Sequence, residues 1–252
     1  MDREYCWPNK MKNQYDVAVL EQACEVFEIS LTEKQKSQFI AYYELLVEWN
    51  KFMNLTGITE FQEVLIKHFA DSLSIVKALD MKEIKSCIDV GTGAGFPGIP
   101  LKIAFPHLKV TLLDSLNKRL KFLDEVIMQL GLEEIKTVHG RAEDGARKQE
   151  LRESFDLSVT RAVAKVNVIS EYCIPYVKTG GYFVAYKSGK VEEELLDGQK
   201  AIAILGGKLE KKEEFILPQS DMERTILLIK KVKQTPKKYP RKAGTPAKDP
   251  LV

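Results

Sequence analysis

The segment that most constrains the fold of this chain is residues 88–98, which read Ile-Asp-Val-Gly-Thr-Gly-Ala-Gly-Phe-Pro-Gly. A short apolar stretch leads into three alternating glycines, and a sequence that can begin a helix follows. Glycine allows the backbone to turn tightly and lets a ligand approach it closely. The free amides at the start of the next helix favour an anionic group. The segment therefore predicts a strand, a ligand-binding loop and a helix in succession.

After residue 85 the sequence alternates between short apolar strands and helices. We predict strands at residues 86–90, 110–113, 135–139, 155–160, 182–187, 208–215 and 224–231. Predicted helices lie at residues 99–105, 116–130 and 168–177, and an acidic helix begins near residue 191. Such alternation is typical of an α/β fold with a Rossmann-like, mostly parallel sheet, here seven-stranded. We expect the last two strands to form an antiparallel pair.

The first 80 residues have helical periodicity instead. Apolar residues recur at helical spacing at Val17, Leu20, Cys24 and Phe27, and then at Phe39, Tyr43, Leu46 and Phe52. Thr32 and Gln35 form a capping box before the second helix, and Thr59 with Gln62 marks the start of a third. We therefore predict a variable extension at residues 1–14, a helical region at 15–82, a domain built on the sheet at 83–232 and a tail at 233–252.

The tail concentrates positive charge. The formal net charge of the chain is only +2, yet residues 230–252 hold eight basic side chains and one acidic one. A basic tail on a mildly acidic body predicts an anionic partner. Four prolines predict an extended tail, and Tyr239 among basic residues suits RNA backbone and base stacking. The RNA-facing candidates in the tail are Lys237, Lys238, Tyr239, Arg241 and Lys242.

Two cofactors fit the glycine loop. Gly93, Gly95 and Gly98 match the dinucleotide fingerprint, which alone is a weak signal. The register that starts at Gly91 favours S-adenosylmethionine (SAM), with Gly91, Gly93 and Gly95 as expected cofactor contacts. In this register Asp89 stands where a carboxylate can face the amino group of the methionine part. In a dinucleotide site the same carboxylate would lie against phosphates.

Further acidic residues follow the next two strands. Asp114 ends the second strand, where it can accept hydrogen bonds from both ribose hydroxyls. Ala142 and Glu143 follow the third strand, where a carboxylate and backbone groups can hold adenine. Gly180-Gly181 precedes the fifth strand, a turn usual in class I methyltransferases. Because the carboxyl ends of parallel strands meet at one edge, these residues predict a single SAM site.

Several other classes of protein are excluded. No apolar run reaches about 18 residues, and the N-terminus lacks the pattern of a signal peptide, so we expect no membrane span and a cytoplasmic location. The four cysteines include no Cys-x-x-Cys pair, so no metal site is expected, and Cys87 and Cys173 are expected in the core. The fourth strand ends without an Asn-Pro-Pro-aromatic motif, which disfavours methylation of an exocyclic amino group.

Four residues outside the loop are candidates for the site. Arg161 follows the fourth strand, where its side chain could meet the cofactor or an RNA phosphate. His68 and Asp71 share one helix face, either as a structural pair or facing the substrate. Lys187, at the end of the fifth strand, is a further candidate for contact with RNA.

Residues 89–98, followed by Leu-Asp-Ser-Leu-Asn-Lys-Arg at 113–119, resemble the RsmG (GidB) family. Further similarity lies at residues 49–51, 54–56, 67–73, 140–143, 161–164 and 238–246. The resemblance implies a class I SAM-dependent methyltransferase that modifies ring nitrogen 7 of a guanine in the decoding-region loop of 16S rRNA. It implies that the partner is 16S rRNA or the small ribosomal subunit. It also implies cofactor contacts at Gly91, Phe96, Ala142, Glu143 and Arg161.

Guanine nitrogen 7 has a free lone pair and no proton to lose, so we expect no catalytic base. Three other functions stay open from the sequence. A metabolite methyltransferase would share the loop without needing the basic tail. A non-catalytic ribosome assembly factor would bind RNA without turnover, and a nicotinamide enzyme would use the later glycine register.

Overall fold

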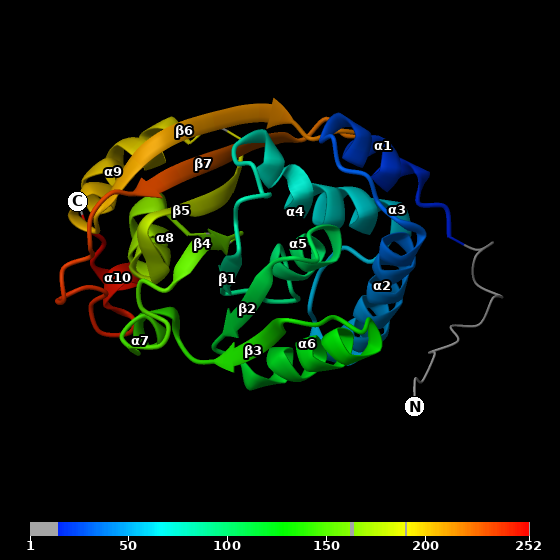
Figure 1. The fold of residues 1–252 in the computed structure, drawn as a ribbon, viewed down its shortest axis with the longest axis horizontal. Coiled ribbons are helices and arrows are strands. Elements are labelled where there is room, and N and C mark those ends of the chain that lie inside the picture. The colour runs from blue at the N-terminus through cyan, green and yellow to red at the C-terminus, as the bar shows by residue number, and fades with distance from the viewer. Residues whose placement is uncertain (1–14, 162–163, 190, 252) are drawn as a thin grey trace.

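Seven strands of the computed structural model form one sheet in the order β3-β2-β1-β4-β5-β7-β6 (Figure 1), within the described residues 15–161, 164–189 and 191–251. The strands are β1 (Ser86–Val90), β2 (Lys109–Asp114), β3 (Ile135–His139), β4 (Phe155–Thr160), β5 (Val177–Ser188), β6 (Gly207–Ile216) and β7 (Glu223–Lys231). The first five strands run parallel to one another, and β7 pairs antiparallel with both β5 and β6. This arrangement confirms the predicted fold class.

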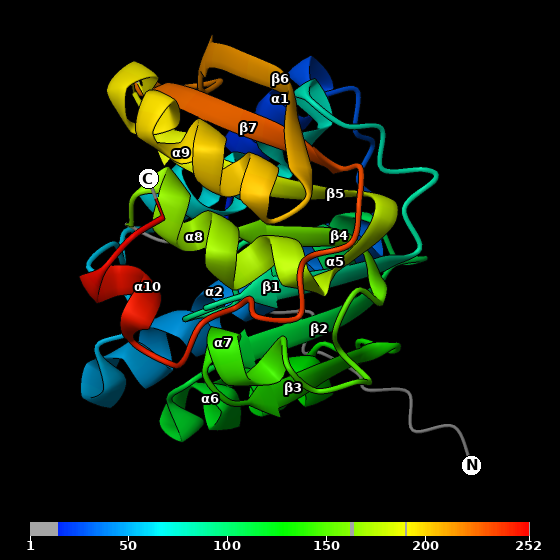
Figure 2. The same cartoon turned by 90° about the vertical axis from the view of Figure 1, so that its left-hand side faces the viewer.

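Helices cover both faces of the sheet, which Figure 1 shows nearly edge-on. One face carries α1 (Ala18–Val26), α2 (Glu33–Met53), α3 (Phe61–Val64), a π-helical turn (Leu65–Ala70), α4 (Asp71–Leu73), a 3₁₀ turn (Ser74–Lys77), α5 (Gly98–Ala104) and α6 (Asn117–Gln129). The other face, turned to the viewer in Figure 2, carries α7 (Ala142–Gly145), α8 (Val166–Cys173), α9 (Glu192–Ile204) and α10 (Thr245–Lys248). Within the described residues, none of the helices has the length and apolar character needed to span a bilayer.

Each face of the sheet has its own hydrophobic core. Successive residues of a strand point to opposite faces, so Val184 belongs to the core under the N-terminal helices, whereas Phe183 and Ala185 belong to the core under α8 and α9. Cys87 and Cys173 are buried in these cores, as predicted. The first core joins residues on both sides of position 82, and the domain division at that position stays a prediction.

The starts of the helices follow from local hydrogen bonds. At Thr32 the predicted capping box is present: its N–H donates to Gln35 Oε1 (2.8 Å), and Gln35 N–H donates to Thr32 Oγ1 (3.3 Å). The predicted start of the third helix at Thr59 is wrong. Glu60 caps this helix instead, because its carboxylate accepts the N–H of Glu63 (2.8 Å).

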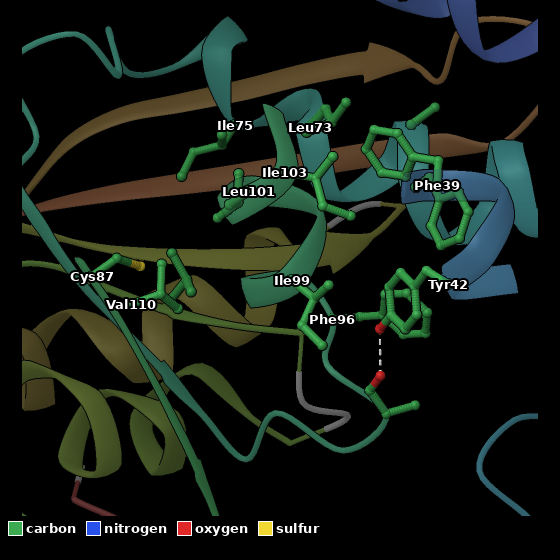
Figure 3. Packing of buried hydrophobic residues seen from close by; sticks show 14 of the residues in the cluster. Phe39, Tyr42, Leu73, Ile75, Cys87, Phe96, Ile99, Leu101, Ile103 and Val110 are labelled. Atoms are coloured by element: carbon green, nitrogen blue, oxygen red, sulfur yellow. Dashed lines mark hydrogen bonds between the residues drawn. The ribbon is translucent and has the colours of Figure 1, made fainter. Parts of the chain in front are cut away.

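The buried stripe of α2 differs from the predicted one at two positions. Phe39 and Leu46 are buried as expected, but Tyr42 replaces Tyr43 as the fully buried aromatic residue, and Phe52 is 67% exposed. Residues 39, 42 and 46 lie at spacings of three and four, which keeps them on one face of the helix. Figure 3 shows Phe39 and Tyr42 in this core.

Two further boundaries differ from the sequence predictions. The helix predicted at residues 168–177 ends at Cys173, and a 3₁₀ turn (Ile174–Tyr176) leads into β5, which begins at Val177 rather than at residue 182. The tail, predicted as extended, contains the short helix α10. The predicted extension at residues 1–14 lies outside the described residues.

Gly181 provides a test of the packing between β4 and β5. A Cβ atom at this position would lie 2.5 Å from the backbone oxygen of Asp156 and 2.9 Å from Val177 Cγ1. We expect Gly181→Ala to lower the free energy of unfolding by about 1–3 kcal/mol, since the backbone of β4 must shift. Urea denaturation measures the change.

The matched control for this prediction is Gly57→Ala. A Cβ atom at Gly57 would meet nothing within 4 Å. This variant should keep or slightly raise the free energy of unfolding, because alanine narrows the unfolded ensemble. Equal losses in the two variants would contradict the prediction.

Candidate cofactor and substrate site

The loop after β1 has an open half and a packed half. Gly91 and Gly93 adopt φ angles of +72° and +62°. A Cβ atom at Gly91 would meet nothing within 4 Å, and one at Gly93 would meet only Gly91 O, at 4.0 Å. Their backbone is therefore free to receive a ligand. In contrast, a Cβ atom at Gly98 would lie 2.4 Å from Leu112 Cδ2.

The packed half of the loop lies against the N-terminal helices. The hydroxyl of Tyr42, on α2, donates a hydrogen bond to the backbone oxygen of Ala94, drawn as the dashed line in Figure 3. A Cβ atom at Gly95 would lie 2.6 Å from this hydroxyl oxygen. Gly95, predicted as a cofactor contact, thus packs against protein. Tyr42 was absent from the sequence predictions because its partner lies 52 residues away.

Asp89, on β1, fixes the loop through two hydrogen bonds. Its side chain is fully buried, and its Oδ2 accepts hydrogen bonds from Thr92 Oγ1 (2.6 Å) and Gly98 N–H (2.9 Å). Among the described residues, its Oδ1 has no hydrogen-bond partner. Burial raises the pKa of Asp89 to about 6, although the two hydrogen bonds and the charge of Arg161 oppose the rise.

Asp114, at the end of β2, holds the loop from the neighbouring strand. Its Oδ2 accepts the N–H of Gly93 (2.9 Å), and its Oδ1 accepts the N–H of Leu116 (2.9 Å). Arg119 Nη1 lies 3.4 Å from Oδ2. The carboxylate is thus fixed beside the open glycines.

Ala142 and Glu143 begin α7, after β3. The backbone oxygen of Ala142 accepts the hydroxyl of Tyr176 (2.6 Å). Glu143 is buried, and its Oε1 accepts the N–H of Gly244 from the C-terminal segment (2.7 Å). A segment remote in the sequence therefore contacts one of the predicted cofactor residues.

SAM is suited to this arrangement. The unpartnered Oδ1 of Asp89 offers an acceptor to a charged amino group, and the bare backbone of Gly91 and Gly93 leaves room for the ligand beside Asp114. Buried carboxyl groups near three consecutive strand ends favour a cation with several hydrogen-bond donors. The cofactor role of these residues stays a prediction.

Arg161 joins a second group of residues, which contacts the loop at Phe96. Its Nη1 lies 3.3 Å from Asp71 Oδ2 and donates to the backbone oxygen of His68 (3.1 Å). Its guanidinium lies 5.4 Å from the centre of the Phe96 ring, which in turn stacks on His68 at 4.5 Å. Phe96 therefore connects the glycine loop to Arg161 and His68.

His68 and Asp71 are both buried and fully engaged. Asp71 also accepts from Arg224 Nε, on β7 (2.8 Å). His68 Nε2 lies 2.8 Å from Thr56 Oγ1, and its Nδ1 lies 3.3 Å from Arg161 Nη2. Burial, helped by the charge of Arg161, lowers the pKa of His68 to about 3. His68 is thus a neutral residue at neutral pH.

A pocket of about 1060 Å³ opens beyond the carboxyl ends of β4 and β5. Its lining brings together five acidic and four basic side chains: Asp71, Glu192, Glu193, Glu194 and Asp197 with Arg161, Lys165, Lys187 and Arg224. Lys187 Nζ donates to the backbone oxygen of Ala164 (2.7 Å) and to Glu194 Oε1 (2.9 Å). Arg224 was not predicted from the sequence. It lines the pocket because the pairing of β7 with β5 places Arg224 opposite Ser188, at the end of β5.

The C-terminal segment differs from the open RNA-binding strip predicted from sequence. Tyr239 is only 8% exposed and belongs to the second core, so no base can stack on it. Arg241 is paired with the buried Glu171 of α8 (2.9 Å). The side chains of Lys237, Lys238 and Lys242 remain exposed.

Comparisons with known proteins agree with this architecture. Residues 35–222 match the GidB family, described as rRNA small subunit methyltransferase G. A solved structure of a segment of StiE O-MT superposes with a TM-score of 0.53 at 14% identity, covering 75% of this chain and 83% of that one. At this identity the likeness supports the fold alone.

Two curated relatives carry the name ribosomal RNA small subunit methyltransferase G. The protein from Lachnoclostridium phytofermentans is 58% identical, with coverage of 89% of this chain and 93% of its own. The one from Alkaliphilus metalliredigens is 52% identical, with coverage of 92% and 98%. Since the family match covers most of the chain and these relatives align along nearly their whole length, the chain belongs to the GidB family of rRNA small subunit methyltransferases G.

Proposed function

We propose that this protein transfers a methyl group from SAM to nitrogen 7 of a guanine in the decoding-region loop of 16S rRNA. The observation that carries the proposal is the set of buried carboxyl groups around the open backbone of Gly91 and Gly93. It occurs in a chain more than half identical to rRNA small subunit methyltransferases G. The substrate is 16S rRNA, either free or within the small ribosomal subunit.

The cofactor-binding residues form the first half of the mechanism. Asp89 Oδ1 receives the amino group of SAM, Asp114 the ribose hydroxyls, and Glu143 with Ala142 the adenine. Phe96 and Arg161 close the side of the site that faces the substrate. When bound, SAM supplies an electrophilic methyl group on a sulfonium. The protein orients this group and excludes water, which is the main contribution such a displacement needs.

Nitrogen 7 of guanine attacks through its own lone pair, so no residue has to remove a proton. His68 is the histidine nearest to Arg161, and both of its ring nitrogens already have partners. Its lowered pKa also makes it a weak base. Its role is to hold Phe96 and Arg161 in place rather than to exchange protons.

The pocket beyond β4 and β5 accepts the guanine after it leaves the RNA stack. Methylation at nitrogen 7 moves a positive charge from the sulfonium to the base. Carboxylates such as Asp71 and Glu194 in the pocket lining stabilise that charge as it develops. The cations Lys187 and Arg224 contact the phosphate or the carbonyl oxygen of the base. Exposed Lys237, Lys238 and Lys242 attract the RNA backbone.

Transfer of label from SAM tests the function directly. Purified protein is incubated with labelled SAM and either free 16S rRNA or intact small subunits. One part of the RNA is digested to nucleosides, and another is cleaved chemically at 7-methylguanosine to locate the modified position. We expect label in 7-methylguanosine at one position of the decoding-region loop, with at least one of the two substrates. Label in another nucleoside, or SAM binding without transfer to either substrate, would overturn the proposal.

The pKa of Asp89 leads to a pH-dependent affinity for SAM. In the free protein the carboxyl is mostly protonated below a pKa of about 6 and ionised above it. Because the ionised form binds the amino group, the affinity should rise by up to about tenfold per pH unit below that pKa and level off above it. Calorimetry between about pH 5 and 7.5 measures this profile. Asp89→Asn should flatten it, and an equally steep profile in that variant would refute the assignment.

The same group affects the stability of the protein without ligand. Asp89 has a pKa of about 6 when folded against an ordinary value of 3.8, so between these values the native state binds more protons than the unfolded state. The contribution of Asp89 to the free energy of unfolding therefore falls as the pH rises through this window. Urea denaturation at several pH values should show that the free energy of unfolding falls less with rising pH in Asp89→Asn than in the unmodified protein.

Lys187 tests the substrate side. We expect Lys187→Met to lower kcat/KM for rRNA by about tenfold or more, because the pocket loses a cation and Glu194 loses its ion-pair partner. The affinity for SAM should stay within about twofold. Lys211→Met is the matched control, since Lys211 Nζ also bonds a backbone oxygen, that of Lys77 (2.7 Å), and a glutamate, Glu213 (2.9 Å). Equal losses in both variants, or a loss of SAM affinity in Lys187→Met, would contradict this role.

A further inference from the structure

The C-terminal segment forms a strap, residues 235–249, that is hydrogen-bonded to the body from Thr235 to Gly244. Thr235 N–H donates to Glu153 Oε1 (2.7 Å), and Arg152 Nη1 donates to the backbone oxygen of Tyr239 (2.9 Å). Arg147 Nη2 donates to the backbone oxygen of Pro240 (2.6 Å). The strap then runs between α7 and α8, and α10 lies beside α8, as Figure 2 shows.

Arg241 is the main anchor in the middle of the strap. Its backbone N–H donates to Glu171 Oε1 (2.6 Å), and its side chain donates from Nε to Oε1 (3.1 Å) and from Nη2 to Oε2 (2.9 Å). Glu171 is fully buried on α8. A buried carboxylate without this cation would be costly, so the pair fixes the path of the strap over α8.

Three residues beyond this anchor, the strap reaches the cofactor side. Gly244 has a φ angle of +83°, a left-handed conformation that directs its N–H to Glu143 Oε1 at 2.7 Å. Glu143 is the residue that holds adenine in the proposed function. Its carboxylate thus receives a fixed hydrogen bond from a segment 101 residues away in sequence.

We propose that Arg241 is a positioning residue for the cofactor site: by anchoring the strap on Glu171, it holds the Gly244 amide against Glu143. This inference rests on the proposed role of Glu143 in SAM binding. The Arg241 side chain is bound to Glu171 and Asp249, and its effect on the cofactor site is transmitted through the strap. The strap therefore serves cofactor binding, whereas the sequence suggested RNA contact alone.

The test is calorimetric titration with SAM, combined with steady-state kinetics on rRNA. We expect Arg241→Gln to weaken SAM affinity about tenfold, the effect of losing a well-placed hydrogen bond to a charged group. Because the defect is in binding, kcat at saturating SAM should stay within about twofold. Arg241→Lys keeps the charge but not the paired geometry, so its SAM affinity should lie between those of the unmodified protein and Arg241→Gln. Asp249→Asn removes the exposed partner of Arg241 (3.3 Å) and should leave SAM affinity unchanged.

Gly244→Ala provides a second variant that leaves Arg241 and Glu171 intact and keeps the test valid if Arg241→Gln fails to fold. It should weaken SAM binding several-fold, since a side chain strains the backbone at this φ. Gly131→Ala is its matched control. Gly131 also has a positive φ (+59°) and nothing within 4 Å of an added Cβ, but it lies after α6, so the same strain should not change SAM affinity.

Glu143→Gln separates this inference from the proposed function. If Glu143→Gln leaves SAM affinity unchanged, the assignment of Glu143 to the cofactor fails. If Glu143→Gln weakens binding but neither Arg241→Gln nor Gly244→Ala does, the strap has no positioning role and the proposed function stands. A fall in kcat of Arg241→Gln at saturating SAM, with unchanged SAM affinity, would also overturn the inference.

Discussion

The site depends on two carboxylates that fix the glycine loop from neighbouring strands. Asp89 binds the loop at Thr92 and again at Gly98, where the next helix begins, and Asp114 binds it at Gly93. Burying Asp89 raises its pKa, so this side chain carries an energetic cost that its two hydrogen bonds offset only in part. The loop therefore has its shape before any ligand arrives, while Asp89 Oδ1 is left for a donor from outside the described residues.

The N-terminal helices belong to the site as much as the sheet does. Tyr42 on α2 fixes the backbone oxygen of Ala94, and its ring lies 5.5 Å from that of Phe96. The segment after α3 supplies His68 and Asp71, which position Arg161. The helical region thus supports the loop from one face of the sheet, and the strap supports Glu143 from the other.

Sequence patterns correctly predicted those parts of the structure that depend on interactions between residues close together in the sequence. The bounds of β1, β3 and β4 and the Thr32 capping box follow from apolar runs and neighbouring side chains, and they were predicted correctly. The glycine loop was found for the same reason. Tyr42, Arg224 and Glu171 were missed as parts of the site because each acts through a partner 52 or more residues away. Arg241 was assigned to RNA because a count of charges does not reveal that Arg241 pairs with the buried carboxylate of Glu171.

The two sides of the site differ in charge for a chemical reason. In the proposed function, the acidic side near the glycine loop receives a cationic cofactor. The pocket beyond β4 and β5 is lined by both acidic and basic side chains, which suits a polyanionic RNA whose target base becomes cationic. Arg161 stands between these two sides, paired with Asp71 and stacked over Phe96. The carboxylate of Asp71 offsets the charge of this guanidinium, which in the proposed function limits its repulsion of the sulfonium. The pairing of Arg161 with Asp71 is thus what allows a cationic side chain to lie close to the site proposed for a cationic cofactor.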